Sequence, residues 1–195
     1  MRLKTILNYG LKFKCFCIGK SEFNEKKDSI IVEIKARTNS KPVCSICGTA
    51  SPGYDTLPER LFEFVPMWGL RVFFRYAMRR VSCPQCKRVV VEAVPWCDGK
   101  NHFTNHYAAF LASWAKELSW KSVAAHFHTS WQTVCSAVES VVNYGLTHRN
   151  LDSVTALGVD EIAWHKGHKY LTLVYQINPL SLIHISEPTR PLYIS

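Results

Sequence analysis

The start of the chain has the residue pattern of β-strands. Apolar and β-branched residues dominate Leu11 to Ile18 and Ser29 to Arg37. The charged segment Ser21 to Asp28 separates these two stretches and has the composition of a loop. We therefore expect residues 1–37 to form a β-rich lead-in.

A second pair of strands is predicted between residues 61 and 81. Leu61 to Val65 and Arg71 to Val81 have strand composition, and Met67-Trp68-Gly69 forms a turn between them. Alternation along the second strand puts three guanidinium groups on one face, those of Arg71, Arg75 and Arg79. The opposite face is apolar and carries Val72, Phe74, Tyr76 and Met78. The arginine row suits contact with a phosphate backbone, or it is a solvated face that keeps a small domain soluble.

From Thr104 the apolar spacing changes to three and four residues, which predicts helices. The first helix has Thr104 as its N-cap, and its apolar face carries Tyr107, Phe110, Leu111, Trp114 and Leu118. A short second helix runs from after Ser119 to Phe127, and His128-Thr129-Ser130 ends it. A third helix starts at Ser130 as N-cap and extends to Tyr144 or Leu146. Its apolar face carries Val134, Ala137, Val138, Val141 and Val142.

The second and third helices have the lengths and the short connection of a helix-turn-helix, whose second helix enters the DNA major groove. The first turn of the third helix supplies the candidate DNA-contacting residues, Trp131, Gln132 and Thr133. A helix N-terminus favours phosphate, and a Gln side chain can pair with an adenine edge. A helical hairpin without a DNA role has the same pattern, in which case Trp131 belongs to the core.

A third region begins at Val154. The apolar run Val154 to Val159 and the strand Tyr170 to Ile177 flank a turn at Trp164 to His168, which predicts an antiparallel hairpin. Asp160 and Glu161 follow the first run, at a position where a carboxylate can hold a divalent ion at a sheet edge. Alone, this acidic pair is also typical of an ordinary loop.

Composition and charge restrict the class of protein. The chain has 195 residues, 47% hydrophobic and 20% charged, and a formal net charge of +9. Such a basic chain favours a polyanionic partner, because neutralising phosphates releases counterions. No apolar run approaches the roughly 18 residues that cross a bilayer, and no signal peptide is evident. We expect a cytoplasmic protein whose eight cysteines stay reduced and available to metal.

Two cysteine doublets, Cys44-Ser-Ile-Cys47 and Cys83-Pro-Gln-Cys86, carry the clearest chemistry. A two-residue spacer lets both sulfurs of a doublet turn toward one point, so four thiolates can close tetrahedrally on zinc. We expect a zinc ribbon at residues 38–98, with the predicted hairpin joining the doublets. Four unconnected buried cysteines, or two disulfides in a secreted protein, are the alternatives. Cys97 is interpreted as a bystander, and Cys15 and Cys17 as packing residues.

With these modules in order, the sequence resembles the DDE transposases of bacterial insertion sequences, specifically the ISL-three family. The matching residues are Cys44-Ser-Ile-Cys47-Gly48, Arg79 to Cys86, Val94-Pro95-Trp96, Ser119 to Ala124, Ser130 to Val134 and Gly158-Val159-Asp160-Glu161, followed by Lys166 to Tyr170. The resemblance covers residues 1 to about 178 and lies more in the order of modules than in one motif.

The resemblance implies a catalytic domain with the RNase H-like fold, in which Asp160 is the first acidic residue of a catalytic triad. In that family two divalent ions, usually magnesium, are held by two Asp and one Glu and promote in-line phosphodiester displacement. The second Asp and the Glu lie downstream of the hairpin, and this chain ends first. Asn178 stands near a position where the family often has an acidic residue.

The last residues suggest why the chain ends before the second Asp and the Glu of the triad. Residues 180–190 back-translate, codon for codon, into the adapter oligonucleotide of a transposon-based sequencing kit, and the residues that follow fit its index and constant bases. We hypothesise that residues 180–195 are translated adapter and exclude them from fold reasoning. Finding those codons in genomic DNA at the source locus would contradict this hypothesis.

The sequence therefore predicts a multidomain α+β protein: a lead-in (1–37), a zinc ribbon (38–98), a helix-turn-helix domain (99–150) and the first β-hairpin of a truncated RNase H-like domain (151–179). The expected function is that of an N-terminal transposase fragment that binds the double-stranded DNA of terminal inverted repeats. It would hold structural zinc, have a second copy of itself as a candidate partner, and not cleave DNA. Magnesium would act in the full-length enzyme. A zinc-ribbon transcription regulator without catalysis is the alternative.

Overall fold

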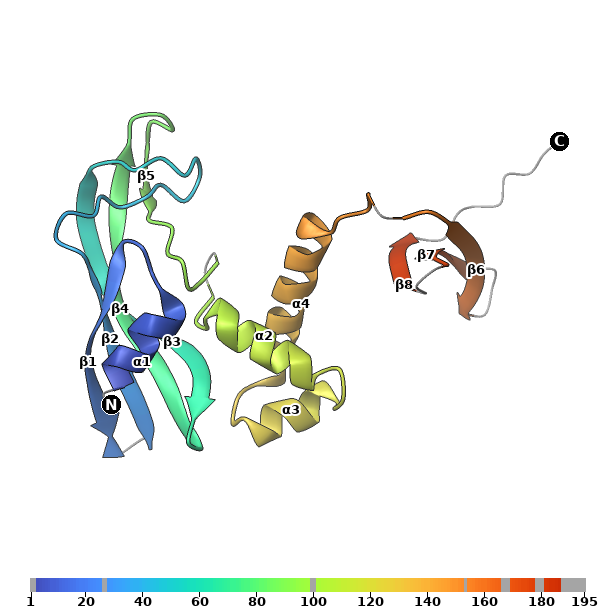
Figure 1. Ribbon diagram of the computed structural model, residues 1–195, viewed down its shortest axis with the longest axis horizontal. Helices are drawn as coiled ribbons and strands as arrows, with labels where there is room; N and C mark the ends of the chain where they lie inside the picture. The colour runs from blue at the N-terminus through green and yellow to red at the C-terminus, as the bar shows by residue number, and fades with distance from the viewer. Residues whose placement is uncertain are drawn as a thin grey trace. The chain divides into compact units, whose positions relative to one another are not determined.

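The longest strands of the computed structural model are the two strands of one hairpin, β3 (Gly53–Met67) and β4 (Leu70–Cys83) (Figure 1). They pair antiparallel, with Phe62 opposite Phe74. The turn between them is Trp68-Gly69, and both residues have positive φ, 54° and 79°. A glycine suits the second of these positions because it has no Cβ to strain there. The predicted hairpin is confirmed, and its strands are longer than the sequence pattern indicates.

The structure describes residues 3–25, 28–98, 101–152, 154–165, 169–177 and 181–186. They form a mixed α and β structure with a sheet-rich body, and the chain divides into two compact units, Met1–Gly145 and Leu146–Ser195. No helix within these ranges is long and apolar enough to cross a membrane.

Strand β4 lies inside a five-stranded sheet that also contains the strands of the lead-in. β1 (Phe16–Asn24) pairs antiparallel with β2 (Ser29–Ala36), and β2 pairs parallel with β4. The order is β1-β2-β4-β3, and the short β5 (Arg88–Val91) also pairs with β4. Residues 1–37 and 38–98 therefore share one sheet.

The predicted strand at Leu11 to Ile18 is wrong in most of its length. A helix, α1 (Leu3–Leu11), precedes a strand that starts only at Phe16. Leu3, Leu7 and Leu11 are four residues apart, and all three contact the hydrophobic core, which is helical spacing. The segment predicted as a charged loop, Ser21 to Asp28, is strand as far as Asn24, because the outermost strand of a sheet tolerates polar side chains.

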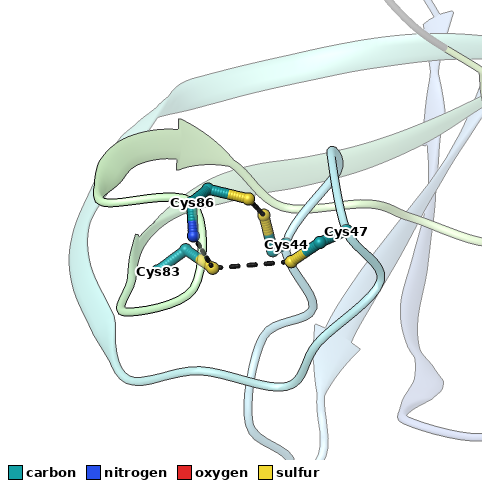
Figure 2. A group of neighbouring side chains, drawn as sticks. All are labelled: Cys44, Cys47, Cys83 and Cys86. Carbon is teal, nitrogen blue, oxygen red and sulfur yellow. Dashed lines mark hydrogen bonds between the residues drawn. The ribbon is translucent and has the colours of Figure 1, made fainter.

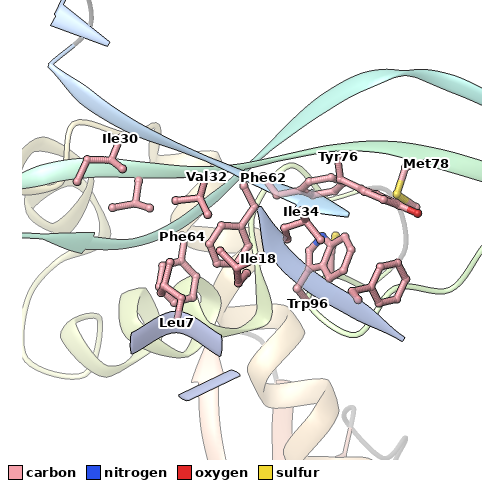
Figure 3. Close-up of a cluster of buried hydrophobic side chains, with 14 residues drawn as sticks. Leu7, Ile18, Ile30, Val32, Ile34, Phe62, Phe64, Tyr76, Met78 and Trp96 are labelled. Carbon is pink, nitrogen blue, oxygen red and sulfur yellow. The ribbon is translucent and has the colours of Figure 1, made fainter. Parts of the chain in front are cut away.

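The core beneath this sheet is centred on Trp96, which is fully buried (Figure 3). Four aromatic rings surround its indole with centroids 4.9–6.1 Å away, those of Phe13, Phe16, Phe62 and Tyr76. Most of these contacts are edge-to-face, the arrangement that the ring quadrupoles favour. Leu7 of α1 closes the core at its edge.

Three further helices pack around a second core. They are α2 (Asn105–Trp114), α3 (Trp120–His126) and α4 (Trp131–His148), as predicted in number and order. Their shared core comprises Phe103, Tyr107, Ala108, Leu111, Val123, Ala124, Val134 and Ala137. One expected detail is wrong: α2 ends before Leu118, which is exposed. α4 ends at His148, two residues beyond the expected limit of Leu146. A mid-helix glycine costs only about 1 kcal/mol, so Gly145 does not stop the helix.

Both predicted N-caps, Thr104 and Ser130, are present, and Ser119 caps α3 in the same way. The Thr104 hydroxyl accepts a hydrogen bond from Tyr107 N at 3.2 Å, and Ser119 and Ser130 do the same for the N–H groups three residues on. Such caps satisfy one of the four N–H groups that a helix start leaves without an internal partner.

The connection into α2 ties the helices to the edge of the sheet. Glu63 N on β3 donates to His102 O, and Thr104 N donates back to Glu63 O, each at 2.8 Å. Asn105 N donates to Trp96 O at 2.8 Å. The start of α2 is therefore held by both the outer strand and the loop that carries the central tryptophan.

The second unit contains three antiparallel strands in the order β6 (Leu157–His165), β7 (Lys169–Gln176) and β8 (Ser181–Ser186). The predicted hairpin is confirmed, although its turn residues 166–168 lie outside the described residues. Gly158 lies within β6 and faces Tyr175, whose ring would overlap a Cβ at this position. Asp160 and Glu161 lie within β6, which corrects their expected place beyond its end.

Strand β8 falls inside the segment that the sequence assigns to a translated adapter, and its backbone pairs with β7. The rest of that segment, including residue 180 and residues 187–195, lies outside the described part of the chain, as does Asn178.

The buried cap at Thr104 should contribute measurably to stability. Thr104→Ala removes the acceptor for Tyr107 N, and we expect the free energy of unfolding to fall by about 1 kcal/mol. Thr104→Ser keeps a hydroxyl and is the matched control. Urea denaturation of both variants checks this, and equal loss in the two would indicate that the methyl group, not the cap, matters.

Candidate metal centre

The four doublet cysteines converge from two loops at one end of the sheet (Figure 2). Cys44 and Cys47 come from the connection between β2 and β3. Cys83 ends β4, and Cys86 lies in the turn before β5. The β3–β4 hairpin is the spacer that brings the doublets together.

The distances between the sulfurs fit a tetrahedral metal site. All four Sγ atoms lie within 4.8 Å of one another. Cys44 Sγ lies 3.9 Å from Cys86 Sγ, and Cys47 Sγ lies 3.5 Å from Cys83 Sγ. Four sulfurs at the usual Zn–S length of ~2.3 Å are ~3.8 Å apart at the corners of a tetrahedron. The four cysteines can therefore hold a metal ion such as zinc.

Backbone geometry at both doublets supports this convergence. Gly48 follows the first doublet with φ of 71° and donates its N–H to Cys44 O, while Lys87 follows the second with φ of 53°. Each doublet thus ends on a residue in the left-handed region, which reverses the chain around the sulfurs. Thr49 Oγ1 donates to Gln85 Oε1 at 2.7 Å and links the two loops directly.

Hydrogen bonds within the cluster shift the pKa values of three of its thiols in different directions. Hydrogen bonds from the Thr49 hydroxyl and backbone lower the pKa of Cys47 to about 6. The Cys86 backbone N–H lowers the pKa of Cys83. The hydrogen bond with Cys47 raises the pKa of Cys86 to about 12. The protein alone therefore favours thiolates at some positions and opposes them at another, and a bound cation would stabilise all four as thiolates.

The remaining cysteines do not join the cluster. Cys97 is buried, and its thiol donates to Asn101 O at 3.1 Å. Burial raises the pKa of Cys97 to about 11, which keeps it a neutral thiol. Within the described ranges, the doublet cysteines are the only group of three or more His, Cys, Asp or Glu close enough to share an ion, so Cys15 and Cys17 also lie outside it.

A buried ion pair, Arg79–Glu92, lies next to the first cysteine doublet. Glu92 has a fully buried side chain and pairs in an antiparallel bridge with Cys44. Its carboxylate accepts from the Arg79 guanidinium at 2.7 Å and from Tyr76 Oη at 2.6 Å. Burial raises the pKa of Tyr76, so its hydroxyl stays protonated as a donor. The signal for Glu92 in the sequence is a single acidic residue within an apolar run, and our sequence analysis missed it.

The predicted arginine row is paired with carboxylates. Arg71 pairs with Glu63 at 2.8 Å, and Arg79 pairs with Glu92. Arg75 lies 3.6 Å from a carboxylate oxygen of Glu22 and 3.8 Å from one of Glu59. Contact of these arginines with DNA stays a prediction.

The first turn of α4 lies at the surface. Trp131 is 50% exposed, Gln132 is exposed and Thr133 is partly buried. The exposure of Trp131 argues against its assignment to the core. The Trp131 and Gln132 side chains are exposed at the helix N-terminus, whereas the Thr133 hydroxyl is hydrogen-bonded to Ser130 Oγ at 2.9 Å.

Asp160 is exposed on β6, and its carboxylate accepts from Glu161 N at 2.8 Å. Neighbouring residues on a strand point to opposite faces, so Asp160 and Glu161 do not share a face. The described residues thus place one carboxylate at this position and do not fit a two-magnesium site by themselves.

Comparison with known proteins points to transposases. The chain is 25% identical over 132 residues to the transposase for insertion sequence element IS1001 of Bordetella parapertussis. It is 29% identical over 152 residues to the transposase for insertion sequence element IS1557 of Mycobacterium tuberculosis, in two strains. The alignments cover 68% and 74% of this chain but 32% and 33% of those proteins.

The chain thus spans about a third of the length of these relatives. No family model matches the chain. No solved structure matches it either. The relatives favour the transposase interpretation over the regulator.

We expect Cys83→Ser to abolish stoichiometric metal binding and to unfold the loops around the doublets, because metal binding and folding are coupled in such sites. Elemental analysis of the purified protein measures the metal, and circular dichroism measures the loss of structure. Cys97→Ser is the matched control and should keep its metal. Undiminished metal in Cys83→Ser would mean that other residues are the ligands.

Glu92→Gln should be destabilising, because it leaves the Arg79 guanidinium without a buried counter-charge. We expect the free energy of unfolding to fall by about 3 kcal/mol. Glu59→Gln removes a carboxylate from an exposed pair and should cost less than about 1 kcal/mol. Chemical denaturation measures the free energy of unfolding of both variants. Similar losses in the two would show that burial of the Arg79–Glu92 pair does not add to stability.

Proposed function

We propose that this chain is the N-terminal, DNA-binding part of an insertion-sequence transposase. The observation that carries this proposal is its similarity to transposases of two different insertion sequences over about 70% of its length. The converging cysteines and the three capped helices give that similarity a physical basis, since they supply a metal-stabilised body and an exposed helix N-terminus.

In this proposal α3 and α4 act as a helix-turn-helix. The four residues 127–130 separate α3 from α4, and His128 takes a positive φ of 52° within that turn. The two helices share the core around Val123, Val134 and Ala137. This arrangement leaves Trp131, Gln132 and Thr133 at the start of α4 free to enter a major groove, where Gln132 would pair with an adenine edge.

We assign zinc to the cysteine cluster, in a structural role. Thiolate ligands in a tetrahedral arrangement favour zinc over magnesium or calcium, which prefer oxygen. Four protein ligands leave no open position for water, so this site would have no part in hydrolysis. Its residues Cys44, Cys47, Cys83 and Cys86 would hold the two loops at the end of the sheet.

The DNA partner we propose is the duplex at the ends of the insertion element. The net charge of +9 favours such a partner through counterion release. Cutting and joining of DNA by magnesium-dependent phosphodiester transfer is the activity that we propose for the full-length transposase, with Asp160 as one of its carboxylates.

Gln132→Ala tests base recognition by α4. We expect binding to duplexes that carry the element ends to weaken by roughly 1–3 kcal/mol, while binding to unrelated duplex changes little. Fluorescence anisotropy with both duplexes at one salt concentration measures this. Glu139→Gln, farther along α4, is the control. Equal loss on both duplexes would assign Gln132 to the phosphate backbone, and absence of DNA binding by the unmodified chain would overturn the proposed function.

A further inference from the structure

A cavity of about 460 Å³ opens on the first unit, and its lining includes neither the first turn of α4 nor any of the four doublet cysteines. Three segments form most of its walls: the connection between α1 and β1, the stretch that leads into the first cysteine doublet, and the stretch that follows β5. Arg79 of β4 and His106 of α2 complete the lining. Phe13, Val43, Val94 and Pro95 supply much of its apolar lining. Cavities of this size bind small molecules or single chemical groups and cannot admit a DNA duplex.

The walls are held in place before any ligand arrives. Ala93 N donates to Val43 O at 2.8 Å, and Arg37 N donates to Cys15 O at 3.0 Å. The Phe13 ring lies 5.4 Å from the central Trp96, which fixes one side of it while it remains partly exposed to the cavity. An aromatic surface and a preformed shape are therefore available to a planar ligand.

The cavity has a positively charged rim. Lys12, Lys14 and Lys41 line it and are exposed. Within the described ranges, none of these three lysines forms an ion pair with a carboxylate. The lining carboxylate, Glu92, is already neutralised by Arg79. The cavity thus joins an apolar interior to a cationic entrance, which suits a ligand with a flat apolar part and an anionic part.

We propose that this cavity binds an unpaired nucleotide of the DNA partner, with the base against Phe13 and its phosphates on Lys12, Lys14 and Lys41. This inference rests on the proposed DNA-binding function and adds a second contact, specific for single-stranded DNA. Proteins that bind single strands combine aromatic platforms with cationic grooves in this way. A free inorganic anion would leave the apolar interior unfilled, whereas a nucleotide matches both parts.

The test compares a blunt duplex with the same duplex carrying a short single-stranded thymidine overhang, by fluorescence anisotropy with the full chain. We expect the overhang to tighten binding roughly tenfold, since a base stacked on an aromatic ring contributes on that scale. Phe13→Leu keeps apolar packing on Trp96 and should remove most of this advantage. Lys14→Gln and Lys41→Gln should reduce it and also weaken its salt dependence.

Lys20→Gln, an exposed lysine on β1 outside this cavity, is the matched control and should leave the overhang advantage unchanged. Binding of the blunt duplex by each variant reports whether it is folded. If the chain binds the blunt duplex and the overhang adds nothing, this inference is wrong while the proposed function stands. If the chain binds neither DNA, the proposed function itself is wrong.

A second measurement locates the base directly. An overhang containing 5-iododeoxyuridine, irradiated in complex with the unmodified chain, should cross-link to an aromatic side chain in the peptide that contains Phe13. Cross-links confined to peptides from α4 would place the overhang on the helices and overturn the inference.

Discussion

The structure depends on matching the charge of Glu92, whose carboxylate lies fully buried at the junction of sheet and metal centre. A buried carboxylate is tolerated only when its oxygens are satisfied, and here Tyr76, the Arg79 guanidinium and Arg79 N all donate to it. The backbone of Glu92 bridges Cys44. One ionic interaction therefore links the central strand, the aromatic core and the first cysteine doublet.

Ion pairs of this kind determine which positive charges of the chain can interact with an anionic partner. Arg71, Arg75 and Arg79 form the most conspicuous basic pattern in the sequence, yet each lies against a carboxylate. Three lysines that form no ion pair among the described residues, Lys12, Lys14 and Lys41, line an apolar cavity instead. A row of like residues on a strand is thus a poor guide to surface potential, because residues distant in sequence supply the neutralising charges.

Local features of the fold were predictable, and its long-range pairings were not. Thr104, Ser119 and Ser130 act at the helix starts where their side-chain chemistry predicts caps, and the two cysteine doublets converge as their spacing indicates. The parallel pairing of β2 with β4 has no local signal, since it depends on residues far apart in the chain. Helix α1 was missed because its apolar face has only three leucines in a short segment. The cavity has no local signal either, because segments far apart in the chain build it.

The place of β4 in the sheet has a consequence for synthesis on the ribosome. β1 and β2 emerge first as an isolated hairpin, and the first cysteine doublet, Cys44 and Cys47, follows them. The edge of β2 stays unpaired until β4 has left the ribosome, and the second pair of thiols arrives with the end of that same strand. An open strand edge is prone to pair with other chains. Nascent chains therefore pass through a stage in which β2 has an unpaired edge and the cysteine cluster is incomplete. Both are completed once β4 and the turn after it have been translated.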